Sequence, residues 1–118
     1  MITGLDHLQL AMPQGSEDAM RAFYCDGLGC VEVEKPVELQ ARGGFWAKAG
    51  QLSLHFGVDH GFHPARKAHP AFVISDLSAL VARLQSAGHV CDWDTSLPDV
   101  RRCFVHDPVG NRIELMAS

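Results

Sequence analysis

The feature that most constrains the fold is a series of secondary-structure patterns that occurs twice along the chain. Each half predicts a strand, then an amphipathic helix, then three further strands. In the first half, residues 7–12 alternate between polar and apolar, and a helix pattern follows Ser16. In the second half, residues 69–75 predict the strand and residues 76–88 predict the clearest helix. Two such β-α-β-β-β modules predict an α+β fold.

The two modules are expected to form a single domain. Module one covers residues 1–58, a connecting loop covers 59–66, and module two covers 67–118. His7 and His69 stand at the same place in the two modules, each at the head of an opening strand. A chain of 118 residues is long enough to bury a core without disulfides or structural metals.

Composition excludes several classes of function. With 47% hydrophobic and 20% charged residues, the chain has a globular composition. Its net charge of −4 lacks the basic excess that a nucleic-acid-binding protein needs. No apolar run approaches the roughly 20 residues of a membrane span. The first residues do not resemble a secretion signal, so we expect a cytoplasmic protein whose four cysteines are free, buried thiols.

Alternation within the strands places four potential metal ligands on one face of the sheet. The helices must cover the apolar face, so side chains of the opposite parity point away from them. His7, His55, His69 and Glu114 share that opposite parity, on the strands that open and close each module. Two or three imidazoles with one carboxylate suit Zn, Mn, Fe, Co or Ni. If these strands are neighbours, we expect the four side chains to converge on a divalent metal.

Each of these residues also has an ordinary interpretation. A histidine on a strand is most often partly exposed and without a ligand, and Glu114 on a terminal strand is most often a solvated edge residue. The metal site is favoured only because the same parity and module position recur together. Trp46 and Trp93 either line an apolar pocket or pack in the core. Arg102 is a better candidate than Arg101 for contact with an anionic substrate, although an arginine at the solvated surface is the alternative.

Several segments resemble one known superfamily. "LDHLQLAM", "AFYCDGLGC", "HPAFVISDL" and "HDPVGNRIELM" are similar to signature segments of the vicinal oxygen chelate superfamily, which includes glyoxalases, bleomycin-resistance proteins and extradiol dioxygenases. The resemblance covers essentially the whole chain. It implies paired modules whose curved mixed sheets surround a cleft, where a metal binds two adjacent oxygens of a substrate. It also implies a homodimer, with the cleft sometimes built from both subunits.

The resemblance implies roles for particular residues. The ligand positions of the superfamily fall on His7, His69 and Glu114. The position in module one that corresponds to Glu114 falls on His55, or on Leu54 if the preceding turn is one residue shorter, and parity favours His55. Because the corresponding glutamate can leave the metal and move a proton in this superfamily, Glu114 is expected to act as both ligand and base.

The substrate and the reaction stay open. Compared with the fosfomycin-resistance thiol transferases, Gln9 replaces a threonine and Phe104 replaces a tyrosine, so fosfomycin resistance is not assigned. Gln9, Phe104, Trp46, Trp93 and Arg102 are the candidate substrate-binding residues. The favoured hypothesis is a metal-dependent lyase or isomerase, thiol transferase or dioxygenase that acts on a small substrate with adjacent oxygens. The alternative is a metal-free, bleomycin-resistance-type binding protein, whose acidic cleft would attract a cationic ligand.

Overall fold

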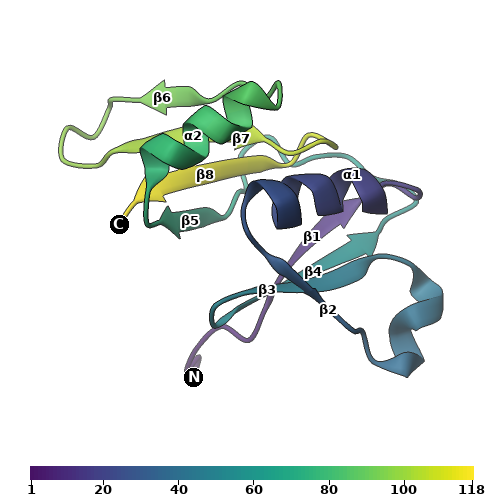
Figure 1. Ribbon diagram of the computed structural model, residues 1–118. Coiled ribbons are helices and arrows are strands. Elements are labelled where there is room, and N and C mark those ends of the chain that lie inside the picture. The colour runs from purple at the N-terminus through teal and green to yellow at the C-terminus, as the bar shows by residue number, and fades with distance from the viewer. The chain divides into compact units, whose positions relative to one another are not determined.

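The computed structural model describes residues 1–118 and divides into two compact units, Met1–His63 and Pro64–Ser118. Each unit contains a four-stranded mixed sheet with helical segments on one face (Figure 1). The predicted order β-α-β-β-β and the α+β class are thereby confirmed in both halves. None of the helices combines the length and the apolar character needed to cross a membrane.

In the first unit, β1 lies beside β4 as a parallel pair, and β4, β3 and β2 form an antiparallel meander. Between β1 and β2, the α-helix α1 continues directly into a π-helix, and a 3-10 helix precedes β3. The elements are β1 (Leu8–Met12), α1 (Glu17–Arg21), the π-helix (Ala22–Gly27), β2 (Val31–Val33), the 3-10 helix (Val37–Arg42), β3 (Phe45–Ala49) and β4 (Leu52–Val58).

The core of this unit lies between its sheet and the helical segment. The side chains of Met20, Phe23 and Tyr24 are buried on the inner face of the helical segment. The Tyr24 ring packs on Phe56 of β4, with ring centroids 4.7 Å apart. Ser16 stands at the N-cap position, but its side chain makes no capping hydrogen bond. Apolar packing, rather than the cap, therefore holds the helix on the sheet.

The second unit repeats this plan with the strand order β5-β8-β7-β6, in which β5 and β8 are parallel. Its helix α2 begins after Asp76, whose carboxylate accepts a hydrogen bond from the Ala79 backbone N–H at 3.0 Å. The apolar side of α2 is buried, with Leu77, Leu80, Val81 and Leu84. The elements are β5 (Ala71–Ile74), α2 (Leu77–Ser86), β6 (Asp92–Asp94), β7 (Arg102–His106) and β8 (Arg112–Ala117).

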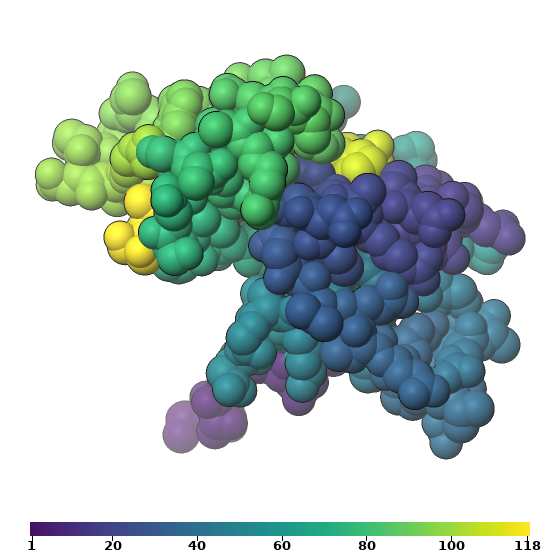
Figure 2. Space-filling model, viewed as in Figure 1, coloured from purple at the N-terminus to yellow at the C-terminus, as the bar shows by residue number.

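Residues 35–44, which contain the 3-10 helix, form a lobe at the margin of the first unit (Figure 2, mid-blue). The lobe returns to the sheet through Gly43 and Gly44, which both have positive φ angles. A Cβ atom at Gly44 would collide with the backbone carbonyl of Phe56, so only glycine fits there. The segment therefore consists of a short 3-10 helix followed by two glycine-dependent bends, and it has neither the helix nor the strand pattern of the neighbouring elements.

All four cysteines are free. Cys30, Cys91 and Cys103 are buried, as predicted, whereas Cys25 is only partly buried. Burial raises the pKa of Cys30 and of Cys103 to about 11, because a thiolate is poorly solvated inside the protein.

Candidate functional site

In the first unit, three aromatic side chains form a row across the sheet face that points away from α1. Strand register sets His55 of β4 beside Gln9 of β1 on one side and Trp46 of β3 on the other. The Trp46 and His55 rings stack with centroids 3.6 Å apart and planes 2° apart. His7, just before β1, stacks on the other side of His55 at 4.1 Å and 19°. The middle ring of the row is therefore His55.

The edge of the His7 ring is held by a carboxylate. His7 Nδ1 donates to Asp6 Oδ1 at 2.8 Å, and this hydrogen bond is the main cause that lowers the pKa of Asp6. Histidines that bind metals commonly donate their other ring N–H to a carboxylate or a carbonyl, which fixes the tautomer. The contact therefore leaves His7 Nε2 as the ring nitrogen with a free lone pair.

The stack limits what His55 can do. A bound metal lies in the plane of an imidazole ring, along the nitrogen lone pair. Two rings stacked with centroids 4.1 Å apart and planes only 19° apart cannot both have the same nearby ion in their ring planes. Partial burial lowers the pKa of His55, and the nearby His7 adds to this effect. The arrangement suits His55 as a neutral wall that supports the His7 ring.

The register also answers whether His55 or Leu54 corresponds to Glu114. In the first unit, the second residue after His7 is Gln9, which pairs with His55 across the parallel strands. In the second unit, the second residue after His69 is Ala71, which pairs with Glu114. His55 and Glu114 therefore occupy equivalent positions, as parity predicts.

A hollow of about 590 Å³ opens on this face of the first unit. The row of rings and the side chain of Gln9 contribute to its lining. Gly57 leaves room for Gln9, because a Cβ at Gly57 would collide with Gln9 Nε2. Four charged residues also line the hollow, and none of them was predicted from the sequence: Asp6, Lys35, Arg42 and Lys48.

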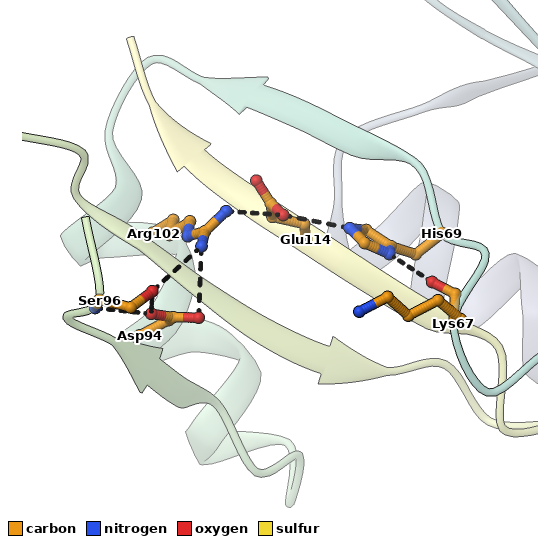
Figure 3. Close-up of polar contacts among 6 residues, drawn as sticks. All are labelled: Lys67, His69, Asp94, Ser96, Arg102 and Glu114. Atoms are coloured by element: carbon orange, nitrogen blue, oxygen red, sulfur yellow. Dashed lines mark hydrogen bonds and ion pairs between the residues drawn. The ribbon is translucent and has the colours of Figure 1, made fainter.

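In the second unit, His69 and Glu114 are in direct contact (Figure 3). Glu114 is only 5% exposed, because β8 lies between β5 and β7 although it is the last strand of the chain. The interpretation of Glu114 as a solvated edge residue is therefore wrong. His69 Nδ1 lies 2.8 Å from the Lys67 backbone carbonyl, and His69 Nε2 lies 3.1 Å from Glu114 Oε1.

The His69 contacts have a chemical consequence. A carbonyl can only accept, so His69 Nδ1 must carry the proton that it donates to Lys67. In a neutral ring, Nε2 then has a bare lone pair that faces a carboxylate oxygen. Two acceptors at 3.1 Å need a proton between them, carried by Nε2 or by the Glu114 carboxyl, or a metal ion.

Arg102 holds Glu114 from the neighbouring strand (Figure 3). Its guanidinium donates to Glu114 Oε1 at 3.3 Å and to Asp94 Oδ2 at 3.4 Å. Asp94 in turn accepts hydrogen bonds from the backbone N–H and the hydroxyl of Ser96, the main causes that lower its pKa. Asp94 and Ser96 were not predicted; the pairing of β6 with β7 brings Asp94 opposite Arg102.

Phe104 and Arg102 lie on the same face as Glu114. The Phe104 ring stands edge-on to His69 at 5.4 Å, and the guanidinium of Arg112 lies over it at 4.1 Å. Arg102 is two residues from Phe104 on β7, and its contact with Glu114 sets it on this face, as its choice over Arg101 requires.

Trp93 and Arg101 lie apart from the Glu114 face. Trp93 pairs with buried Cys103, whose side chain is on the helix side of β7. The Arg101 guanidinium stacks on the Trp93 ring at 4.6 Å and donates to the Ser78 hydroxyl at 2.9 Å. Trp93 is 44% exposed and lines a separate hollow of about 430 Å³, so it does not pack in the core.

The predicted ligands thus form two pairs, one in each unit. His7 and His55 are together in the first unit, and His69 and Glu114 are together in the second. Neither unit by itself gathers three or more histidine, cysteine or carboxylate side chains in a group that could hold a metal ion.

Comparison with solved structures shows the same fold in several proteins. A Bacillus anthracis protein assigned to the glyoxalase family is 44% identical, with a TM-score of 0.94 over 100% of this chain and 97% of that chain. A mutant of the fosfomycin resistance protein FosX from Listeria monocytogenes, complexed with Mn(II) and 1S,2S-dihydroxypropylphosphonic acid, is 18% identical, with a TM-score of 0.83 over 100% and 94% of the two chains.

A third structure, lactoylglutathione lyase from Agrobacterium tumefaciens, is 18% identical, with a TM-score of 0.69 over 94% and 92% of the two chains. The similarity to FosX and to the lyase is one of fold alone. No family model and no curated protein matches the chain. Because the similarity to the Bacillus anthracis protein combines high identity with full coverage, the chain belongs to the glyoxalase family of the vicinal oxygen chelate superfamily.

Proposed function

We propose that the protein is a divalent-metal-dependent enzyme that acts on a small substrate with adjacent oxygens, with His7, His69 and Glu114 as the metal ligands. The observation that carries this proposal is the pair of acceptors formed by His69 Nε2 and Glu114 Oε1. Their separation of 3.1 Å suits two ligands of one ion. Ligands about 2.1 Å from a metal at a right angle are about 3 Å apart.

The donor set also fits such an ion. Two imidazoles and a carboxylate suit Zn, Mn, Fe, Co or Ni, and leave positions open for substrate oxygens. Both proposed histidines have the second ring nitrogen engaged, His7 by Asp6 and His69 by the Lys67 carbonyl. This is the outer contact that fixes a histidine ligand in the correct tautomer. The Mn(II) bound to FosX supports a metal in this fold.

Glu114, Arg102 and His55 would have different roles in the reaction. When bound, a divalent ion polarises adjacent substrate oxygens and stabilises negative charge that develops on them. Arg102 orients the Glu114 carboxylate through Oε1, and Oε2 accepts neither the Arg102 nor the His69 contact. We assign to Glu114 Oε2 the transfer of a proton from or to the substrate. His55 keeps the ring of His7 in place through the stack.

Metal analysis of protein purified without a histidine tag tests this proposal. We expect a stoichiometric divalent metal in the native protein and its loss in His69→Ala and in Glu114→Gln. His60→Ala is the matched control, because it removes an exposed histidine of the loop and should leave the metal content unchanged. A folded native protein that neither contains nor takes up a divalent ion would refute the proposal and favour the metal-free binding protein.

We further propose that the protein is a homodimer. Both β1 and β5 are edge strands, and an edge strand has backbone groups that a second chain can pair with. Light scattering should give the mass of two chains, and the mass of one chain would contradict the proposal. Mixing His7→Ala with Glu114→Gln tests how the site is shared, because an intact site reappears only if it combines modules of two subunits.

A further inference from the structure

We propose that the hollow of the first unit is an anion-binding subsite that takes a carboxylate or phosphate group of a small molecule. The identification of that molecule as the substrate rests on the proposed function. The subsite itself rests on the charges, the walls and the size of the hollow.

The hollow is basic in an acidic protein. The chain has a net charge of −4, yet three cations line the hollow, namely Lys35, Arg42 and Lys48. The single acid in the lining is Asp6, and its carboxylate is engaged with His7. None of the three cations forms an ion pair within the protein. A concave surface lined by charge of one sign concentrates ligands of the opposite sign.

The backbone positions these cations. Lys35 Nζ donates to the backbone carbonyl of Gly43, so the ammonium group is fixed by a neutral acceptor and keeps its charge uncompensated. Arg42 is the last residue of the 3-10 helix, directly before the two glycine-dependent bends that return the chain to β3. Lys48 shares the face of Trp46, because the two are two residues apart on β3. The three cations therefore border the hollow from the lobe and from the sheet.

The walls and the volume suit a small molecule. The stacked rings of Trp46 and His55 supply a flat surface for the uncharged part of a ligand. A volume of about 590 Å³ is in the range typical of small-molecule sites. Lysine and arginine are the side chains that recognise carboxylate and phosphate oxygens. The basic lining opposes the cationic ligand that the overall acidic composition suggested.

Fluorescence of Trp46 provides the test. Trp93 does not line this hollow, so Trp93→Phe leaves Trp46 as the only tryptophan without altering the subsite. The full-length protein is stripped of metal with a chelator and dialysed. It is then titrated with inorganic phosphate and, separately, with acetate, while chloride keeps the ionic strength constant. Metal removal ensures that the anion does not bind to a metal instead.

We expect a saturable change of Trp46 emission with one or both anions. Arg42→Gln/Lys48→Gln should weaken this binding about tenfold or more, since hydrogen bonds to charged groups are lost. The control Arg66→Gln/Arg83→Gln removes the same charge from the second unit and should leave binding unchanged. Comparison of the phosphate and acetate arms identifies the preferred acidic group.

Two results would overturn the subsite: no saturable response of the metal-free protein to either anion, or an undiminished response in Arg42→Gln/Lys48→Gln. Metal content measured on the same samples separates this proposal from the proposed function. Anion binding by a protein that takes up no metal leaves the subsite standing without the enzyme. A stoichiometric metal without anion binding leaves the enzyme standing without the subsite.

Discussion

The two units share one backbone plan but fill equivalent positions with different chemistry. His55 and Glu114 both pair with the second residue after an opening histidine, and both stand on inner strands. In the first unit the position carries a neutral imidazole between two other rings. In the second it carries a buried carboxylate in contact with a histidine and an arginine. Equivalent positions in the fold therefore have side chains with different chemistry and different contacts.

The neighbouring antiparallel strand accounts for this difference. In the first unit β3 places Trp46 directly opposite His55, so that the two rings stack. In the second unit β7 places Phe104 opposite Glu114, but the Phe104 ring stands edge-on to His69. The Glu114 carboxylate is then reached by Arg102, which lies two residues from Phe104 on the same face.

The largest expected effect on metal affinity is found when each of the two equivalent residues, Glu114 and His55, is replaced by glutamine in a separate variant. Glu114→Gln should weaken binding of a divalent metal by about a hundredfold or more, because it removes a charged ligand. His55→Gln should weaken it tenfold at most, since the stack supports His7 without contacting the metal. Calorimetric titration of each variant with Mn(II) measures both values. Equal losses in the two variants would show that His55 is a ligand too.

A smaller effect is expected at the pair of adjacent arginines. Arg102→Gln should weaken metal binding about ten- to a hundredfold, in the range typical of residues that orient a ligand. Arg101→Gln is the matched control, because Arg101 contacts Trp93 and Ser78 on the other side of the sheet. Its metal affinity should stay within about twofold of the native value. If both variants lost affinity equally, the network drawn in Figure 3 would not be what orients Glu114.

The sequence predicts those features of the site that depend on alternation within one strand, but not those that depend on how the strands are ordered and paired. Alternation correctly made His55 the counterpart of Glu114, because strand parity is a local property. The burial of Glu114 was missed, because it follows from the strand order, which puts the last strand inside the sheet. The contact of Arg102 with Asp94 depends on register in the same way.

The stack of aromatic rings and the basic lining of the hollow could not be predicted from the sequence either. The stack of His55 between His7 and Trp46 depends on side-chain rotation, which a pattern of residue types does not encode. The basic lining of the hollow joins Lys35 and Arg42 of the lobe to Lys48 of β3. That grouping arises from a segment without helical or strand periodicity.

The smallest expected effect is on the free energy of unfolding at high pH, and it compares a buried thiol in each unit. The pKa of Cys30 and of Cys103 is raised from 9.0 to about 11 in the folded protein. An unfolded thiol ionises first as the pH rises, so the stabilising contribution is complete below about pH 9 and is lost toward pH 11. Between pH 8 and pH 10 each thiol should cost roughly 1 kcal/mol of unfolding free energy.

Urea unfolding at the two pH values measures this loss. Cys30→Ala and Cys103→Ala should each reduce the difference between pH 8 and pH 10 by a similar amount. If the units form a single domain, each profile should also be one cooperative transition. A difference that is unchanged in either variant would mean that the corresponding thiol is not protected from ionisation in its unit.

The central proposal is that His7, His69 and Glu114 bind one metal ion, with His55 outside its coordination shell. Pulsed electron paramagnetic resonance of the protein loaded with Cu(II) counts the imidazoles that bind the ion. We predict two imidazoles in the native protein and in His55→Ala, and one in His7→Ala and in His69→Ala. An unchanged count in His7→Ala, or a count that falls in His55→Ala, would contradict the account.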